Sequence, residues 1–217
     1  MRIRILVFLA KTVRLSFFNT LIILSSTLFS PAAASAQTEE EMKMLQMYFR
    51  EDELVVSPTR TLKPISKVAE NISVVTAEDI EAMNAHTVIE VLGRVPGVFI
   101  DLHTYDFGSD GDIYIQGSEG RHVLVLVDGL PWNFTGGGAA VTQTIPVRII
   151  KRIEIIRGPA SSSWGSALGG VINIITKDTK NSDGISGTVS ASVGERDTHD
   201  VSAEVTSNPG IGYYLYA

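Results

Sequence analysis

The segment from Pro146 to Lys177 constrains the fold most, because it holds two apolar runs joined by a connection rich in glycine and serine. In the first run, Arg152 and Glu154 alternate with isoleucines, whereas residues 171–176 are almost entirely apolar. A nearly continuous apolar run is typical of a strand that is covered on both faces of its sheet. The segment therefore predicts a strand, a loop and a second strand that is covered on both faces.

Residues 1–36 have the pattern of a secretory signal peptide. Basic residues precede an apolar stretch from Leu15 to Phe29, and small residues follow it up to the pair Ala34 and Ala36, which places cleavage before Gln37. A membrane-spanning helix needs about 20 apolar residues, and this stretch is shorter and interrupted by polar side chains. We therefore expect an exported chain, with an uncleaved anchor as the alternative.

The composition excludes several classes of protein. The chain has no cysteine, which rules out disulfides and thiolate metal sites. Its net charge is −6, and removal of the basic signal peptide makes the mature chain more acidic still. Because acidic domains bind nucleic acid poorly, we expect no nucleic-acid partner.

Signatures of catalysis are missing from the sequence. The histidines are scattered without a metal-binding pair, the connection at 158–170 lacks the ending of a phosphate-binding loop, and no nucleophile elbow is present. Asp106, Asp110 and Asp112 could bind Ca²⁺ through oxygen ligands, but the Glu that an EF-hand loop needs at its twelfth position is absent. A solvated turn is the favoured interpretation, so we predict no enzyme, no cofactor and no metal.

Capping and strand patterns divide the central part of the chain into short elements. Thr76 and Asp79 predict a capping box before a helix that starts near Ala77, and residues 87–90 repeat the device before a helix that ends near Gly93. Apolar or alternating runs predict strands at residues 72–75, 98–101, 113–116 and 123–127. These elements, with the two strands described above, predict a small α+β domain.

Several motifs of this domain occur in a characteristic order. They are Thr76-Ala-Glu-Asp-Ile80, Leu92-Gly-Arg-Val-Pro-Gly-Val98, Leu124-Val-Leu-Val-Asp-Gly-Leu-Pro131, Arg157-Gly-Pro159 and Gly169-Gly-Val-Ile-Asn-Ile-Ile-Thr-Lys177. From Asn71 to Lys177 the chain resembles the plug domain of TonB-dependent outer-membrane receptors. The resemblance implies a small mixed-sheet plug domain with two short helices at residues 71–180.

Residues 37–70 are expected to be a tether ahead of the plug domain, beginning with either a short amphipathic helix or disordered chain at 37–51. The tether contains an acidic and β-forming peptide, which we call the box segment: Asp52, Glu53, Leu54, Val55, Val56 and Ser57. From its residues alone this peptide is either a short edge strand of the domain or a strand that adds to another protein's sheet. The resemblance favours the second interpretation, because family members carry a TonB box here. In the family this box pairs in the periplasm with TonB, which works with ExbB and ExbD.

Two loops, at residues 103–111 and 131–139, carry aromatic and polar side chains that could contact a ligand. The candidates are His103, Tyr105, Asp106, Asp110, Trp132, Asn133 and Phe134. In the family, plug loops touch the incoming siderophore or cobalamin. The alternative for Trp132 and Phe134 is packing against the wall of the barrel.

The resemblance also implies contacts that hold a plug inside a barrel. Arg157 matches an arginine that meets barrel carboxylates in the family, and Arg121 is a related candidate. An arginine that often precedes the glycine of an earlier strand is Gln116 here, which removes one expected charge-assisted contact.

Residues 181–217 alternate small apolar and polar side chains, which suits the first strands of an incomplete transmembrane β-barrel. At about ten residues each they supply two or three strands, whereas the smallest outer-membrane barrels need about eight. The expectation is therefore that the chain is either a fragment of a longer receptor or the product of a truncated gene.

The combined prediction is the plug portion of a receptor in the cell outer membrane. Such a receptor imports a scarce nutrient chelate, a siderophore or a cobalamin-like compound, and is gated when the box segment pairs with TonB. The alternative is a soluble periplasmic plug-like module that binds without transporting. The sequence does not identify the transported compound.

Overall fold

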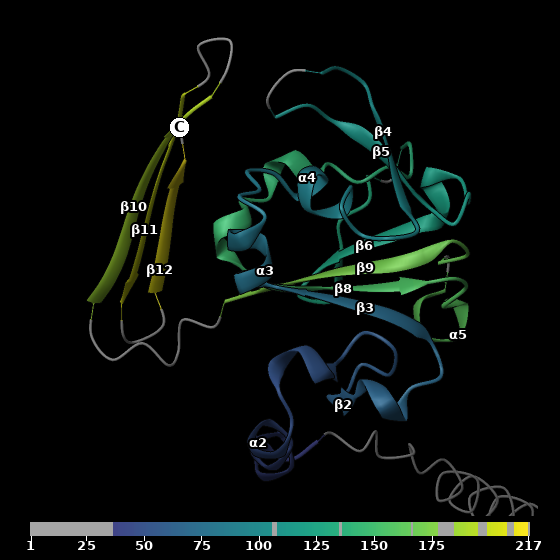
Figure 1. Ribbon diagram of the computed structural model, residues 1–217. Helices are drawn as coiled ribbons and strands as arrows, with labels where there is room; N and C mark the ends of the chain where they lie inside the picture. The colour runs from purple at the N-terminus through teal and green to yellow at the C-terminus, as the bar shows by residue number, and fades with distance from the viewer. Residues whose placement is uncertain are drawn as a thin grey trace, which may run out of the picture. The chain divides into compact units, whose positions relative to one another are not determined.

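The computed structural model describes residues 37–105, 108–134, 136–165, 167–177, 185–194, 199–207 and 211–216 (Figure 1). The predicted signal peptide at residues 1–36 and the ligand candidate Asp106 lie outside these residues. Within the described ranges, none of the helices is long and apolar enough to cross a membrane.

A five-stranded mixed sheet forms the centre of the domain (Figure 1). Its order is β3 (Asn71–Thr76), β8 (Ile150–Arg157), β9 (Gly170–Thr176), β6 (Val123–Val127) and β7 (Leu130–Pro131). The pair β6 and β9 is parallel, and the other neighbouring pairs are antiparallel. The predicted strand, loop and strand are β8 and β9, and residues 170–174 of β9 are buried, as the apolar run predicted.

Two short helices and a hairpin cover one face of this sheet. Helix α3 (Ala77–Ala82) begins with the predicted capping box, in which the Thr76 hydroxyl and the Asp79 carboxylate bond to each other's backbone N–H groups. Helix α4 (Val88–Leu92) is capped by the Thr87 hydroxyl and ends at Gly93. The hairpin consists of β4 (Val98–Leu102) and β5 (Gly111–Ile115).

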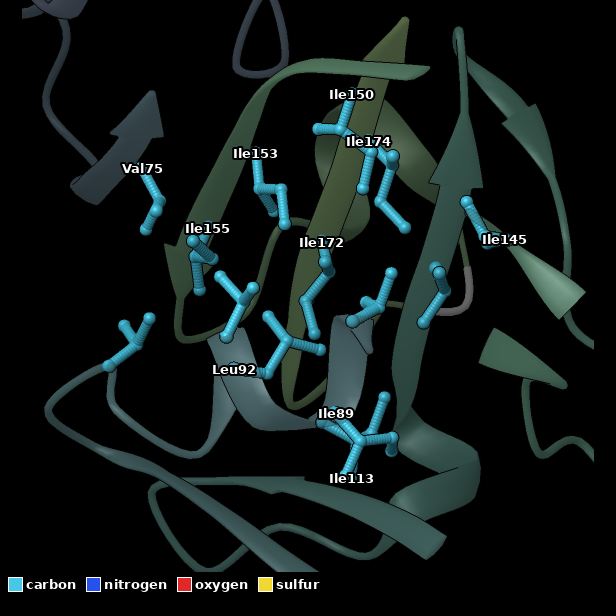
Figure 2. Close-up of a cluster of buried hydrophobic side chains, with 14 of the residues drawn as sticks. Val75, Ile89, Leu92, Ile113, Ile145, Ile150, Ile153, Ile155, Ile172 and Ile174 are labelled. Atoms are coloured by element: carbon cyan, nitrogen blue, oxygen red, sulfur yellow. The ribbon is translucent and has the colours of Figure 1, made fainter. Parts of the chain in front are cut away.

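The main core lies between the sheet, helix α4 and the hairpin. Figure 2 shows Ile153 and Ile172 of the sheet pointing toward Leu92 of α4 and Ile113 of β5. Full burial of one such side chain stabilises the fold by about 1.5–3 kcal/mol. A smaller cluster on the other face of the sheet gathers Leu126, Ile156, Ala160, Ala167 and Val171, with Trp164 packed against it.

The connection between β8 and β9 differs from the expected loop, because one helical turn, α5 (Ser161–Trp164), lies within it. The Ala160 carbonyl accepts hydrogen bonds from the N–H groups of Ser163 and Trp164. This turn places Trp164 against the smaller cluster. The expectation of a loop failed because tertiary packing of one tryptophan orders a stretch that has no helical periodicity.

The tether contains more secondary structure than its sequence predicted. Helix α2 (Glu39–Tyr48) has Thr38 as its N-cap and no buried residue. It is followed by the two-stranded pair of β1 (Leu54–Val55) and β2 (Lys63–Pro64). Single 3-10 turns are η1 (Glu51–Glu53), η2 (Ile65–Lys67), η3 (Gly120–His122), η4 (Thr142–Thr144) and η5 (Val147–Ile149).

The last part of the chain forms an antiparallel three-stranded sheet. Its strands are β10 (Ile185–Val193), β11 (His199–Ser207) and β12 (Ile211–Tyr216), in that order. Val189 and Val193 are exposed on one face, while the hydroxyls of Ser190 and Ser202 lie 2.6 Å apart on neighbouring strands. The α+β class, the mixed sheet and the strands that follow it are therefore confirmed.

Candidate functional site

The box segment lies within the domain in this structure. Leu54 and Val55 pair with Pro64 and Lys63, and their side chains are 3% and 0% exposed. Ser57 is also fully buried. The segment thus adopts the short-strand conformation that was the alternative interpretation, whereas its pairing with TonB stays a prediction.

A buried carboxylate on the central sheet holds the end of the box segment. The Glu154 carboxylate accepts hydrogen bonds from the Val56 N–H at 2.9 Å, the Ser57 N–H at 2.8 Å and the Ser57 hydroxyl at 2.6 Å. Arg152 Nε donates to the other Glu154 oxygen at 2.9 Å. We call this set of contacts the Glu154 clamp. A buried charge is tolerated only when it is paired and hydrogen-bonded, and these contacts meet that condition.

The carbonyl groups of the same stretch are held by the connection between β8 and β9. Trp164 Nε1 donates to the Ser57 carbonyl at 2.6 Å, and the Ser163 hydroxyl donates to the Pro58 carbonyl at 2.7 Å. The Arg60 guanidinium donates to the Ser163 carbonyl at 2.7 Å and lies 4.3 Å from the Trp164 ring, a cation–π distance. Helical turn α5 therefore secures residues 57–60 through contacts that are separate from the clamp.

An open cavity of about 410 Å³ borders this site. Its lining comes from the chain after β1, the β6–β7 turn, strands β8 and β9, and α5: Val56, Arg60, Asp128, Gly129, Arg152, Trp164, Asn173 and Ile175. Residues 56–60 are not part of the main core, so this stretch is held by the polar contacts described above.

The acidic residues at the start of the box segment make only surface contacts. Asp52 lies 3.1 Å from Arg50, and the Glu53 carboxylate accepts the Arg50 N–H at 2.9 Å. The neighbouring Glu51 lies 3.1 Å from Lys151. Exposed ion pairs of this kind contribute about 0–1 kcal/mol each, so the buried contacts are what hold the segment.

In the first candidate ligand loop, His103 and Tyr105 are exposed. His103 Nε2 lies 3.5 Å from Asp112, and its Nδ1 lies 3.9 Å from Asp110. The Tyr105 side chain is 87% exposed. His103 and Asp110 are thus brought together, and Tyr105 is available to an external partner.

In the second candidate loop, Asn133 has an internal role, and Trp132 Nε1 donates to the Val141 carbonyl at 3.2 Å. Asn133 accepts the Val125 N–H at 2.8 Å and donates to the carbonyls of Val123 and Gly138 at 2.9 and 2.7 Å. Its amide therefore occupies backbone groups of β6 and of its own loop. Trp132 and Phe134 on either side are exposed, so the aromatic candidates remain accessible.

The two candidate arginines for barrel contacts differ in their surroundings. Arg157 donates to the Pro96 carbonyl at 2.8 Å and to the Asn71 side chain at 2.7 Å, while its buried Nε has no partner among the described residues. Arg121 pairs with Glu119 at 2.6 Å on the surface. Contacts of either arginine with a barrel remain predictions.

Sequence reasoning missed the role of Glu154. The alternation of Arg152 and Glu154 with isoleucines is typical of a strand with one solvent-exposed face, yet both charged residues are buried. Val56 and Glu154 are 98 positions apart, so no local pattern connects them. The only available signal was the pair of opposite charges within an otherwise apolar strand.

Residues 64–171 match the family model described as the TonB-dependent receptor plug domain. The vitamin B12 transporter BtuB of Photobacterium profundum is 42% identical over 126 residues, which cover 58% of this chain and 20% of the transporter. Among solved structures, the pyoverdine outer membrane receptor FpvA of Pseudomonas aeruginosa PAO1 has a TM-score of 0.59 at 22% identity. That match covers 70% of this chain and 21% of FpvA.

The alcaligin outer membrane receptor FauA of Bordetella pertussis has a TM-score of 0.58 at 19% identity, over 70% of this chain and 26% of FauA. Fold and sequence together define the central domain as a receptor plug domain. Residues 64–171 belong to the plug domain family of TonB-dependent receptors, and the chain spans about a fifth of the length of its B12-transporter relative. These relatives are transporters and receptors rather than enzymes.

Proposed function

We propose that this chain is the plug-bearing N-terminal part of an outer-membrane receptor that imports a scarce nutrient chelate, a siderophore or a cobalamin-like compound. The support is the plug domain, together with a 42% identical relative that is a vitamin B12 transporter. Cobalamin is therefore the first ligand to test. On this proposal the exposed aromatics Tyr105, Trp132 and Phe134 contact the ligand, and β10–β12 begin the barrel.

The proposed mechanism requires no covalent chemistry. The box segment pairs with TonB as an added strand in the periplasm, and force applied through the tether shifts or partly unfolds the plug to open the lumen. Strand addition uses main-chain hydrogen bonds, which suits an acidic Leu-Val-Val-Ser peptide. The observation that carries the proposal is the position of this peptide directly ahead of a plug domain. Only two residue pairs join β1 to β2, and so small a ladder opens more easily than the five-stranded sheet.

Replacing Leu54 with proline in the native receptor tests this mechanism. Proline removes an N–H group and cannot donate to a ladder, so uptake of labelled cyanocobalamin or a ferric siderophore should be lost while binding of that ligand to cells is retained. Ala69→Pro is the matched control. Ala69 is exposed in the same tether, and Val68 before it is already extended at φ −112° and ψ 145°, as proline requires. Normal uptake by Leu54→Pro would remove the box segment from the mechanism, and failure of the wild type to bind either ligand would contradict the proposed substrates.

A further inference from the structure

We infer that the Glu154 carboxylate controls access to the box segment by occupying the N–H groups that a partner strand would need. This inference rests on the proposed function, because it takes the box segment to be the strand that the periplasmic partner binds. Glu154 acts here as a positioning residue, which holds the segment in a closed arrangement on strand β8.

The backbone groups at the end of the box segment are all engaged. The N–H groups of Val56 and Ser57 donate to Glu154, and the Ser57 carbonyl accepts from Trp164. Pro58 has no N–H group, and its carbonyl accepts from Ser163. A partner strand pairs through the same kind of backbone donor and acceptor. Pairing along this stretch therefore requires that the Glu154 clamp and the contacts from α5 break first.

The start of the box segment is closed by burial as well. The side chains of Leu54 and Val55 are buried, and both residues already pair with β2. A partner strand that binds side chains in pockets, as added strands do, cannot reach them in this arrangement. The closed arrangement thus blocks both the backbone and the side chains of the segment.

The choice of a carboxylate explains how one side chain holds two successive N–H groups. One carboxylate offers about four acceptor positions and donates nothing when ionised, and bonds from N–H groups to it are stronger than neutral ones. Glutamine at position 154 is neutral and keeps a single acceptor oxygen, so its amide NH2 must face either the donors of the box segment or the Arg152 Nε–H. Glu154→Gln therefore weakens the clamp while preserving the size of the side chain.

The cavity beside the clamp provides a route for opening. It lies beside Val56 and Arg60 and is also lined by Arg152 of β8. Residues 56–60 are not part of the main core, so the segment can move without displacing that core. Once it has moved, Glu154 retains Arg152 as its charged partner. The pair of charges inside β8 thus remains compensated in the open arrangement.

The test measures binding of the purified periplasmic domain of TonB to the native receptor without transported ligand, for wild type and Glu154→Gln. If the clamp limits access, Glu154→Gln binds about tenfold tighter or more. Exchange of the Val56 and Ser57 amide hydrogens accelerates by about the same factor. Asp79→Asn is the matched control, because Asp79 also accepts bonds from one backbone N–H and one hydroxyl, both of Thr76, and does not touch the box segment.

The control separates regulation from a structural role. Replacing a residue that only stabilises the plug lowers the unfolding temperature and leaves TonB affinity unchanged. This is the result expected for Asp79→Asn. Unchanged or weaker binding by Glu154→Gln, while Leu54→Pro abolishes binding, would overturn the clamp and leave the proposed function standing. Absence of TonB binding to the wild type and to Glu154→Gln alike would instead overturn the proposed function.

Discussion

Gly170, the first residue of β9, should not tolerate even an alanine. Its φ is +155°, a backbone conformation that side chains rarely adopt. An added Cβ would collide with the Ile156 carbonyl oxygen and lie 2.8 Å from Ile115 Cδ1. The carbonyl belongs to the backbone of β8 and cannot rotate away. The residue is also paired on both sides, with Arg157 of β8 and Val123 of β6.

The expected cost of Gly170→Ala follows from these two effects. Overpacking of a filled site costs about 1–3 kcal/mol, and a non-glycine residue in an unfavourable φ region costs about 1–3 kcal/mol. The free energy of unfolding should therefore fall by about 2–6 kcal/mol. A domain of this size has about 5–15 kcal/mol in total, so the substitution removes a large fraction of its stability.

Urea unfolding of the mature chain, followed by circular dichroism, measures this loss. With a dependence of about 1–3 kcal/mol per molar urea, the midpoint should fall by about 0.7 M or more. Gly137→Ala is the control, because Gly137 is exposed, does not have a positive φ and has no heavy atom within 4 Å of an added Cβ. If the midpoints of Gly170→Ala and Gly137→Ala agree, the steric argument at the start of β9 is wrong.

Two further predictions concern stability. Leu92→Ala, at a side chain that is fully buried in the main core, should lower the free energy of unfolding by about 2–5 kcal/mol. Leu168→Ala, at a 55% exposed position, is the control and should have almost no effect in thermal unfolding. Equal losses of stability in the two variants would refute the placement of the core. The pKa of Asp79 is lowered by the hydrogen bonds from the backbone N–H and then the hydroxyl of Thr76. A carboxylate whose pKa is lower in the folded state stabilises the fold at pH values above its unfolded-state pKa of about 3.9. This stabilisation is lost as the pH falls through the folded-state pKa. Asp79→Asn should make the unfolding temperature depend less on pH in this acidic range. An unchanged pH dependence of the unfolding temperature would count against the capping box.

Local features of the fold could be predicted because their causes lie within a few residues. The caps at Thr76 and Thr87 each involve a residue three positions away, so the starts of α3 and α4 follow from the sequence. The apolar run of β9 likewise reports burial on both faces, since the composition of a strand reflects what covers it. The order of the plug motifs extended these local predictions to the family.

The state of the candidate site was decided by contacts between distant parts of the chain. Glu154 meets Val56 across 98 positions, and Trp164 meets Ser57 across 107. A short acidic and apolar peptide is equally suited to a strand of its own domain or of a partner's sheet, because either choice satisfies its backbone. In this structure the buried carboxylate and the tryptophan N–H complete those hydrogen bonds, so tertiary structure, and not the sequence of the peptide, determines that it is closed.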